Sequence, residues 1–379
     1  MITVLQTLPS LEFGGVERGT IEVADELVRQ GHRSLVISAR GRLVKQLTEN
    51  GSEHIEMPIG KKSLLTFRYV RVLRKLIKDN NIDIVHARSR LPAWICYLAC
   101  RGIAREHRPG FVTTVHGHYS VNPYSKIMTY GDRVIAISEF INQYILKNYS
   151  NIAPEKISVI PRGVDSNNYP YGFKPPDTWV RSWNEQYPQF RNKYLVTLPG
   201  RISRRKGHDD FLNILLALKN SGANTHGLIV GGAQPGKVNY ENDIKAKASL
   251  LNINNSVTFL GHRDDLREIL SVSNVVLSLS QEPEAFGRTV LEPVSMGVPV
   301  IAYDHGGASE ILKKIFPEGL ITNGDINAAA ERVLSLMKSS PSVPDTNPYT
   351  LQRMLDNTLS LYGAIASVRK ANSSGFRKH

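Results

Sequence analysis

Short apolar runs alternate with longer amphipathic segments along the first half of the chain. The short runs are rich in Val, Ile and Leu, which predicts buried strands at 2–7, 34–38, 82–86, 110–115, 133–138 and 158–160. The longer segments repeat their apolar residues at helical spacing, which predicts helices at 14–29, 64–78 and 92–100. Apolar strands that alternate with helices are typical of a parallel sheet covered on both faces.

The pattern is interrupted between residues 161 and 191. This stretch contains five prolines and few aliphatic residues, so we expect a linker with some local structure. The alternation then resumes, with strands expected at 194–198, 227–231, 256–260, 275–279 and 298–302 and helices at 208–220, 239–251, 264–271 and 287–296. A last helix is expected from residue 348 to about residue 368.

The length of the chain supports the same division. A chain of 379 residues is too long for one ordinary core, so the sequence predicts two Rossmann-like, doubly wound α/β domains that face each other across a cleft. Ligands of such sheets bind at the carboxyl ends of the strands, which are expected to face the cleft. The expected parts are a first domain at 1–165, a linker at 166–191, a second domain at 192–345, a helix at 346–369 that crosses back onto the first domain, and a disordered tail at 370–379.

The composition fits a folded enzyme with a large positive charge. Hydrophobic residues make up 41% and charged residues 21% of the chain, and the formal net charge is +13. Such a charge favours a negatively charged partner: a nucleotide, a nucleic acid, an anionic lipid or a phosphorylated glycan. The N-terminus begins as a strand and no apolar run has the length of a membrane span, so we expect a cytoplasmic protein.

The two cysteines, Cys96 and Cys100, stand four residues apart and therefore on one face of a helix. No further ligands stand at a matching spacing. The sequence therefore favours two core thiols in a reducing compartment over a metal site.

The stretch from residue 278 to residue 311 carries the clearest chemistry. It contains Glu284 and Glu292, with an apolar strand before them and a glycine turn and second strand after them. If a helix starts near Phe286 or Gly287, Glu284 lies just before its N-terminus and Glu292 about two turns inside the helix. The free N–H groups of such an N-terminus suit an anionic ligand, and carboxylates accept hydrogen bonds from sugar hydroxyls.

This stretch resembles the donor-sugar signature of the GT-B glycosyltransferases, specifically the large retaining family numbered four. The family usually shows Glu-Gly-Phe-Gly where this chain has Glu284, Ala285, Phe286 and Gly287, and the likeness extends over nearly the whole chain. It implies a GT-B fold of two Rossmann-like domains. It also implies that Glu292 accepts hydrogen bonds from ribose hydroxyls and that Glu284 lies beside the donor sugar.

The same helix start supplies backbone donors to the expected site. The amides of Phe286, Gly287 and Arg288 fall at the helix N-terminus, where they are expected to complete the binding of the donor. The glycines at 306 and 307, together with Glu310, complete the downstream turn of the motif and are expected to shape the site and to contact the sugar.

A glycine turn followed by cations stands directly after the first strand of the second half. Gly200 begins it, and the sequence then presents backbone N–H groups and positive charge before a helix, as phosphate binding requires. A basic loop alone is usually a solvated surface. Together with the glutamate pair it resembles the diphosphate-binding residues of the family, which implies that Arg201 and Lys206 bind the donor diphosphate and leaves the roles of Arg204 and Arg205 open.

Cations at this place have a chemical purpose in the reaction of the family. Negative charge builds on the departing phosphate, and fixed cations in a cleft of low dielectric constant stabilise it. Another glycosyltransferase fold uses a metal held by an Asp-x-Asp motif instead. The nearest match here, Asp209 and Asp210, lacks that spacing, so we expect no metal and no separate cofactor.

The first half contributes two weaker signals. Gly14 and Gly15 follow the first strand and permit close backbone approach by a phosphate or sugar, although a plain strand-to-helix turn explains them as well. They do not form Gly-x-Gly-x-x-Gly, which disfavours a nicotinamide cofactor. His116 and His118 follow a later strand; the resemblance implies that one of them lies near the donor sugar, with His116 the better match and His118 the alternative. We expect His116 to position the substrate rather than to act as a general base.

The first half ends on a motif that resembles Pro-Asn-Gly-Val-Asp of the family. Here it reads Pro-Arg-Gly-Val-Asp over residues 161–165, with Arg162 in place of asparagine. We interpret it as a structural boundary that also contacts the cleft.

The segment at 61–78 carries seven Lys and Arg residues and no acidic residue. Its apolar residues can form one stripe, so it is either a basic helix that lies on an anionic membrane or a sheet-covering helix with a solvated outer face. Residues 1–165 contain 23 Lys and Arg against 15 Asp and Glu. In the resembling fold this half binds the acceptor, which suggests a phosphorylated or lipid-linked acceptor at the inner face of a bacterial membrane. Lipopolysaccharide core assembly is the leading expectation, followed by capsule or other surface glycans.

The sequence thus predicts a retaining glycosyltransferase that moves a sugar from a nucleotide-sugar, expected to be a UDP-sugar, to a glycan or glycolipid. Anionic membrane lipid is a further expected contact, and nucleic acid is not expected. Two alternatives stay open. One is a sugar-nucleotide epimerase of similar architecture, and the other is a non-catalytic polyanion-binding protein.

Overall fold

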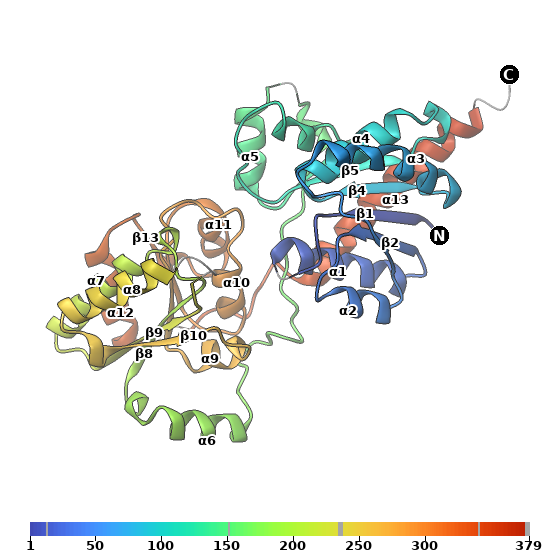
Figure 1. The fold of residues 1–379 in the computed structure, drawn as a ribbon. Helices are drawn as coiled ribbons and strands as arrows, with labels where there is room; N and C mark the ends of the chain where they lie inside the picture. Colours follow the sequence, from blue (N-terminus) through green and yellow to red (C-terminus); the bar gives the residue numbers. More distant parts are fainter. Residues whose placement is uncertain (13, 151, 234–237, 340–341, 376–379) are drawn as a thin grey trace. The chain divides into compact units, whose positions relative to one another are not determined.

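The computed structural model describes residues 1–12, 14–150, 152–233, 238–339 and 342–375, and the chain divides into two compact α/β units (Figure 1). Unit 1 combines Met1–Gly163 with Leu351–His379, and unit 2 is Val164–Thr350. Each unit has its own sheet, and every strand pair found in the described residues is parallel. The Rossmann-like fold class expected from the alternating pattern is confirmed.

The sheet of unit 1 has the order β3-β2-β1-β4-β5-β6-β7. Its strands are β1 (Thr3–Thr7), β2 (Arg33–Ser38), β3 (Glu53–Glu56), β4 (Ile84–Ala87), β5 (Gly110–Val115), β6 (Arg133–Ala136) and β7 (Ile157–Val159). Its helices are α1 (Gly15–Arg29), α2 (Val44–Glu49), α3 (Tyr69–Asp79), α4 (Arg90–Arg101), α5 (Glu139–Asn148) and α13 (Leu351–Gly375), with 3-10 turns η1 (Leu64–Arg68), η2 (Arg105–His107), η3 (Ser125–Thr129) and η4 (Pro154–Lys156).

The last helix, α13, packs on the sheet of unit 1, as the sequence predicted (Figure 1). Successive side chains of β4 point to opposite faces, so Ile84 and His86 face one way and Val85 the other. Ile84 belongs to a core cluster with residues of α1 and α13. The helix residues of this cluster include Val23, Leu27, Met354, Leu355, Leu359, Tyr362 and Ile365. The helix continues to Gly375, beyond its expected end, and the remaining four residues of the expected tail lie outside the described residues.

One polar contact fixes α13 within this apolar cluster. The buried Tyr362 hydroxyl lies 2.5 Å from Nδ1 of His86, whose Nε2 lies 2.6 Å from Oγ1 of Thr114 on β5. Burial, followed by the positive charges of Arg88 and Arg162, holds the pKa of His86 well below its ordinary value. The ring is therefore neutral and can satisfy both neighbours.

Unit 2 has a sheet of the order β10-β9-β8-β11-β12-β13. Its strands are β8 (Tyr194–Pro199), β9 (Thr225–Val230), β10 (Val257–Gly261), β11 (Val275–Ser278), β12 (Val300–Tyr303) and β13 (Leu320–Ile321). Its helices are α6 (Asp177–Gln186), α7 (His208–Asn220), α8 (Val238–Leu250), α9 (Leu266–Val272), α10 (Arg288–Ser295), α11 (Gly306–Ile315) and α12 (Ile326–Ser339), with 3-10 turns η5 (Pro188–Phe190), η6 (Arg204–Lys206), η7 (Asn254–Ser256) and η8 (Pro317–Gly319).

The stretch expected as a linker contributes to the core of unit 2. Residues 166–191 contain α6 and η5, whose aromatic residues Trp183 and Phe190 are buried with Leu195 and Leu228 of the sheet. Trp179 stacks on Trp183 at a centroid distance of 5.0 Å. The proline-rich composition predicted a linker with some local structure, and its aromatic residues in α6 and η5 also pack into the core of unit 2.

The basic segment at 61–78 differs from the single helix that its pattern predicted. Ser63 caps its start by accepting a hydrogen bond from the Leu65 amide, and the first turn closes as the 3-10 helix η1 before α3 begins. The expected apolar stripe is therefore split. Leu73 and Ile77 of α3 are buried, whereas Leu64 is 88% exposed.

The strand order of each sheet reverses once, and this reversal defines where a ligand binds. In unit 1 the chain proceeds from β1 to β3 on one side and then resumes with β4 on the other side of β1. In unit 2 the chain proceeds from β8 to β10 on one side and then resumes with β11 on the other side of β8. Loops after two such strands diverge to opposite faces and leave a crevice at the carboxyl edge, which is where open α/β sheets bind ligands.

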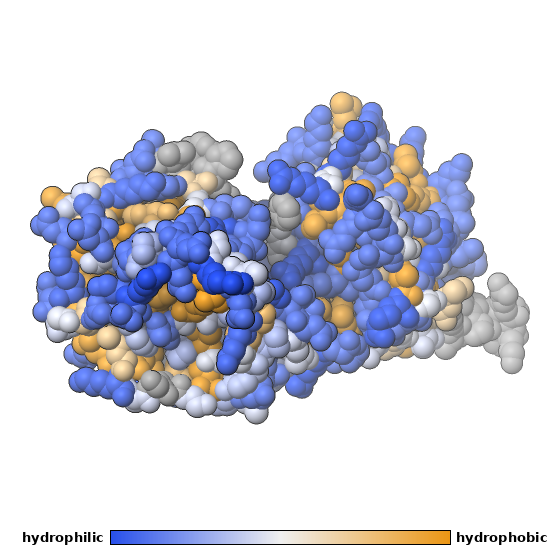
Figure 2. Space-filling view, turned by 90° about the horizontal axis from the view of Figure 1, so that it is seen from below, coloured by the Kyte–Doolittle hydropathy of each residue, from blue (hydrophilic) through white to orange (hydrophobic). Residues whose placement is uncertain are grey.

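We compared the surface and the helices of the described residues with the requirements of a membrane span. On the face shown in Figure 2 hydrophilic residues predominate, with hydrophobic residues between them. Among the helices of the described residues, none combines the length and the apolar character needed to cross a bilayer.

The contact between Tyr362 and His86 leads to a stability prediction. Tyr362→Phe removes the hydroxyl and leaves Nδ1 of His86 buried without a partner, which we expect to lower the free energy of unfolding by about 1–3 kcal/mol. Urea titration of the variant measures this change. Tyr130→Phe, at an exposed ring, is the matched control and should leave the free energy within about 0.5 kcal/mol of the parent. Equal stabilities for all three proteins would contradict the anchoring role of the contact.

Candidate active site

The loop after β8 turns one of its basic residues toward the loop after β11. Lys206 ends η6, and its Nζ donates a 2.5 Å hydrogen bond to Oε1 of Glu284. The hydroxyl of Ser280 donates to the same oxygen. The Lys206 and Glu284 side chains are 27% and 19% exposed, so the ion pair is partly shielded from water and still accessible to a ligand. The reversal between β8 and β11 thus places two expected site residues together.

The surroundings keep the Glu284 carboxyl ionised. Burial alone would raise its pKa, but the charge of Lys206 and the hydrogen bonds from Lys206 and Ser280 outweigh burial and hold the pKa below its usual range. An ionised carboxylate only accepts hydrogen bonds. Glu284 can therefore orient an ammonium group and a sugar hydroxyl, and it is not poised to donate a proton.

The other cations of the loop occupy separate places. Arg204 forms a 3.6 Å ion pair with Asp243, and Arg205 a 2.9 Å ion pair with Glu282; all four side chains are more than half exposed. Exposed pairs of this kind contribute little to stability. Arg201 is exposed and follows Gly200 at the mouth of the loop. The structure thus separates Lys206, which faces Glu284, from the two arginines whose roles the sequence left open.

The second glutamate of the motif is fixed by its own helix. Glu292 is the fifth residue of α10, a little more than one turn from the start, so the expectation of two turns was too deep. Arg288, one turn before it, donates a 3.0 Å hydrogen bond from Nε to Oε1, and its Nη2 lies 2.8 Å from the same oxygen in an ion pair. No described residue bonds Oε2, which leaves a second acceptor for a ligand.

The start of α10 is open to an anion. Gly287 is the N-cap with a φ of 108°, and no side chain caps the helix. The first amides of a helix have no intrahelical acceptor, so those of the first turn are available. Phe286 is buried and packs edge-on against Tyr349 at a centroid distance of 5.8 Å. Its side chain therefore anchors the loop, and only its backbone can serve the site.

A glycine pair holds the Glu284 loop in place. The Gly307 amide donates a 2.8 Å hydrogen bond to the carbonyl of Glu284, and a Cβ on Gly306 would lie 2.7 Å from that carbonyl oxygen. Ala285, which replaces the usual glycine of the family, does not have a positive φ. The substitution therefore costs the loop no backbone strain.

Unit 1 carries the remaining expected residues. Gly15 begins α1 after Gly14, and a Cβ on Gly15 would meet no atom within 4 Å. The packing of the protein therefore does not demand glycine at that position, which is consistent with space kept for a ligand.

His116 lies after β5 and is oriented by Arg162. Nη2 of Arg162 lies 2.9 Å from Nδ1 of His116, and arginine can only donate, so Nδ1 is the acceptor and the proton of the neutral ring lies on Nε2. That Nε2 is buried and has no hydrogen-bond partner in the described part of the chain. Burial, followed by the positive charges of Arg162 and Arg88, holds the pKa of His116 well below its ordinary value. His116 is therefore a neutral donor with an unused N–H group.

His118 has a different environment. Its exposed ring packs edge-on against Phe140 and Tyr144 of α5, at centroid distances of 4.7 and 4.9 Å. It is held by aromatic contacts, whereas His116 presents a shielded polar atom.

The carboxylates that stood nearest to a metal motif are engaged in structural contacts. Asp209 accepts from the Tyr240 hydroxyl at 2.7 Å and from Lys247 at 2.8 Å. Asp210 accepts from Gln281 and from the Tyr303 hydroxyl. Within the described residues no group of three His, Cys, Asp or Glu side chains could hold a metal ion.

Sequence reasoning missed two partners that complete these contacts. Ser280 follows β11 without any periodic or motif signal, and its bond to Glu284 appears only in three dimensions. Arg162 was noted as a departure from the family motif, but its contact with His116 joins residues 46 positions apart. A Cβ on Gly19 of α1 would lie 2.1 Å from Nη1 of Arg162, so this glycine provides the space for the guanidinium group.

The loop that carries Lys206 depends on Gly207, which leads to a second prediction. Gly207 has a φ of 72°, and a Cβ there would lie 2.1 Å from the carbonyl oxygen of Leu279. Gly222 has a φ of 77°, and a Cβ there would meet no atom within 4 Å. An alanine at Gly222 would therefore strain the backbone as at Gly207 but would not collide with a neighbour. Gly222→Ala should therefore lower the free energy of unfolding by about 1–2 kcal/mol, and Gly207→Ala by more, with loss of the Lys206 contact. Urea titration compares the two variants, and equal losses would show that the loop tolerates a displaced Leu279.

Two family models match the chain in succession. The model of Glycosyltransferase Family 4 matches residues 13–168, and that of Glycosyl transferases group 1 matches residues 180–352. A crystal structure of a glycosyltransferase from Rickettsia africae is 32% identical, with 96% of this chain and 98% of that chain covered and a TM-score of 0.85.

Curated relatives carry related activities in their names. The phosphatidylinositol N-acetylglucosaminyltransferase GPI3 subunit of Saccharomyces cerevisiae is 24% identical, with 97% of this chain and 83% of the relative covered. The UDP-Gal:alpha-D-GlcNAc-diphosphoundecaprenol alpha-1,3-galactosyltransferase of Escherichia coli is 26% identical, with 76% of this chain and 77% of the relative covered. These likenesses favour glycosyl transfer over the epimerase and polyanion-binding alternatives. The chain belongs to the GT-B glycosyltransferases of the family-four type.

Proposed function

We propose that this glycosyltransferase moves a sugar from a nucleoside diphosphate sugar to a phosphorylated, lipid-linked acceptor, with retention of the anomeric configuration. One observation carries the donor side of the proposal. Lys206 and Glu284 form a partly shielded ion pair at the strand-order reversal of unit 2, beside the uncapped start of α10.

Lys206 is suited to bind the diphosphate of the donor. Its ammonium group has three N–H donors, of which Glu284 uses one, so it can hold a phosphate oxygen while it keeps its carboxylate partner. Arg201 stands at the exposed mouth of the same loop and adds a second cation. As the glycosidic phosphate bond breaks, charge builds on the leaving oxygen, and cations that are already in place stabilise it without reorganisation.

Glu292 and the start of α10 are suited to the rest of the donor. Arg288 pairs with Oε1 of Glu292 and thereby orients the carboxylate. The other oxygen, Oε2, can accept hydrogen bonds from the ribose hydroxyls. The first-turn amides of α10 can bind the diphosphate or the sugar. The name of the Escherichia coli relative specifies UDP-Gal, which supports a UDP-sugar as the donor.

The proposed reaction uses no protein nucleophile. The bond between the anomeric carbon and the phosphate oxygen breaks, and the acceptor hydroxyl oxygen bonds to the same face of the sugar. The hydroxyl proton passes to an oxygen of the departing diphosphate. Glu284 remains ionised and orients Lys206 and the sugar, and His116 donates from Nε2 to a sugar hydroxyl.

The acceptor is proposed from charge and from the relatives. Residues 1–165 carry a surplus of cations, and the two relatives named above act on phosphatidylinositol and on a diphosphoundecaprenol-linked sugar according to their names. Both acceptors combine a phosphate with a lipid. We propose the same chemical class here, used at the inner face of the cell membrane, and lipopolysaccharide core assembly is one instance of it.

Replacement of Lys206 tests the donor site. Lys206→Ala should lower kcat by about 100- to 1000-fold, because a preorganised charge at the leaving group contributes a few kcal/mol to the barrier. Glu292→Ala should weaken UDP binding by about tenfold or more. The measurements are turnover with a panel of UDP-, GDP- and ADP-sugars and thermal shift with each nucleotide.

Lys245→Ala is the control for these variants, because Lys245 pairs with Glu241 on the exposed face of α8. It should keep the parent kinetics. If Lys206→Ala also keeps them, or if none of the nucleotides stabilises the protein, the donor site is elsewhere.

Replacement of Arg162 tests the orientation of His116. Arg162→Met removes the donor to Nδ1 and one of the charges that depress the pKa, so the His116 pKa should rise toward the ordinary value near 6.5 while burial still holds it below that value. Titration of the ring nitrogens by NMR measures the shift and the tautomer. Arg162→Lys keeps the charge and should leave the pKa nearer to that of the parent. A Met variant whose His116 titrates as in the parent would contradict the role given to Arg162.

A further inference from the structure

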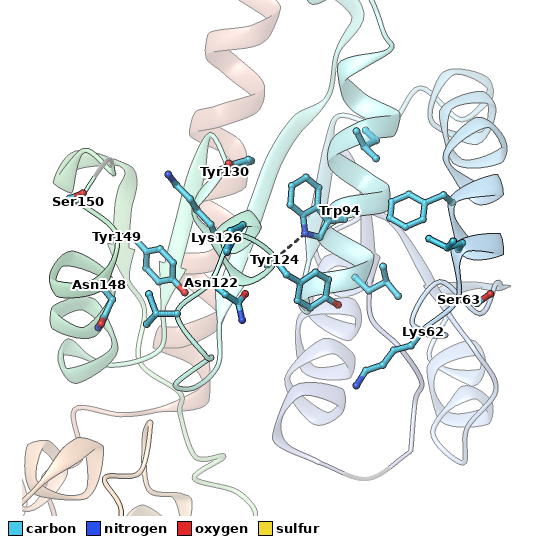
Figure 3. A pocket seen from close by; sticks show the side chains of 16 residues that line it. Lys62, Ser63, Trp94, Asn122, Tyr124, Lys126, Tyr130, Asn148, Tyr149 and Ser150 are labelled. Carbon is cyan, nitrogen blue, oxygen red and sulfur yellow. Dashed lines mark hydrogen bonds between the residues drawn. The ribbon is translucent and has the colours of Figure 1, made fainter.

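Unit 1 contains a large apolar groove that the donor site does not use. Its volume is about 1130 Å³, above the range of about 300–1,000 Å³ that is usual for small-molecule pockets. It extends from η1 and the start of the basic segment, past α4 and the loop after β5, to the end of α5 (Figure 3). Its apolar lining includes Leu91, Trp94 and Leu98 of α4 together with Phe67 and Val121.

The Trp94 ring of the groove is held in place by contacts within the protein. Nε1 of Trp94 donates a 3.0 Å hydrogen bond to the carbonyl of Tyr124, drawn as a dashed line in Figure 3. Its ring packs edge-on against Tyr130 at a centroid distance of 6.0 Å. The polar atom of the indole is thereby satisfied within the protein, and the ring is left to contact an apolar ligand.

The charges around the groove are all of one sign. Among the described residues that line the groove, Lys62 and Lys126 are charged, and none is Asp or Glu. Lys62 belongs to the segment at 61–78, which has seven cations and no acidic residue. Leu64 and Leu65, next to it, are 88% and 72% exposed. A groove lined mostly by apolar side chains, whose charged lining residues among those described are lysines, is complementary to a hydrocarbon chain that ends in a phosphate.

We propose that this groove binds the hydrocarbon chain of the phosphorylated lipid that carries the acceptor sugar. The chain lies along Trp94, Leu98 and Phe67, and Lys62, in the segment that follows β3, binds the phosphate. This inference rests on the proposed lipid-linked acceptor and adds the place where its lipid is held.

The position of the groove in the fold agrees with this assignment. One of its walls, residues 121–130, lies in the same connection between β5 and β6 that begins with His116. The loops after β3 and β5 both emerge at the carboxyl edge of the sheet, where the ligands of such sheets bind. A lipid held in the groove therefore keeps its phosphate end at the edge that carries the sugar-handling histidine.

The test uses the full chain with geranyl monophosphate and farnesyl monophosphate as probes. Trp94 is one of three tryptophans, and the other two stack on each other in unit 2, so a change in fluorescence that disappears in Trp94→Phe reports on the groove. Each buried methylene strengthens binding by about fourfold, so farnesyl monophosphate should bind at least about tenfold more tightly than geranyl monophosphate. Inorganic phosphate should give no signal.

Two glutamate substitutions on the same basic segment separate the groove from the surface around it. Phe67→Glu places a carboxylate in the groove and should weaken farnesyl monophosphate by about tenfold or more. Val72→Glu adds the same charge at a position that is 49% exposed and outside the lining, and should change the affinity by less than about threefold. Both side chains are exposed, and thermal melting confirms that the variants fold.

Several results would overturn the inference. They are equal affinities for the two chain lengths, equal weakening by the two glutamates, and an equal signal with inorganic phosphate. Thermal shift with UDP is measured on the same samples. Binding of UDP without binding of either isoprenyl phosphate contradicts the groove and leaves the donor site intact, whereas the opposite result supports the groove and contradicts the donor site.

Discussion

The reversal of strand order between β8 and β11 is the constraint on which the donor site depends. Parallel strands carry their loops at one edge, and at a reversal the two adjacent loops lead to opposite faces of the sheet and leave a crevice. The loop after β8 ends in Lys206 and the loop after β11 carries Glu284, so residues 78 positions apart form a 2.5 Å contact. The sheet brings the two loops to one edge, and Gly207, Gly306 and Gly307 permit the close backbone contacts that hold them there.

The same arrangement explains why an anion site can be stable without its anion. A lone ammonium group in a partly buried crevice loses hydration and would be costly. Glu284 offsets that cost, and Ser280 adds a second hydrogen bond to the carboxylate. Glu284 accepts a hydrogen bond from one N–H group of Lys206, which leaves the other two N–H groups for a phosphate. The pair is therefore a preorganised site, in the sense that its charges are fixed before the reaction begins.

The sequence allowed the two-unit α/β architecture to be predicted because apolar strands and amphipathic helices differ in period. The strand at 110–115 agrees with β5 to the residue, and the return of the last helix to unit 1 was expected as well. The pattern failed where the apolar residues serve two purposes. Leu64 and Leu73 both belong to the expected apolar stripe, yet Leu64 is exposed in η1 and Leu73 is a buried residue of α3, because the segment starts as a 3-10 helix and not as one continuous α-helix. The edge strand β3 was missed because its sequence, Glu-His-Ile-Glu, is mostly polar.

The site residues that belong to sequence motifs were predictable, and their contact partners were not. Glu284, Glu292 and Lys206 came from motifs, and the structure supplied their partners Ser280 and Arg288. Contacts between distant segments had no such signal, as the Arg162–His116 bond illustrates.

Unit 1 repeats the topological rule of unit 2 but places its cations differently. Arg88 directly follows β4 at the reversal, is 2% exposed, and donates to Oε1 of Gln6 from Nε at 2.9 Å and from Nη2 at 2.5 Å. A buried guanidinium held by an amide oxygen lowers the proton affinity of the histidines around it, and this is one physical cause of the neutral state of His86 and His116. A neutral imidazole can donate from Nε2 without adding a third charge to the interior. The buried Arg88 and the half-buried Arg162 of unit 1 thus act through the histidines, whereas the lysine of unit 2 is open to the ligand itself.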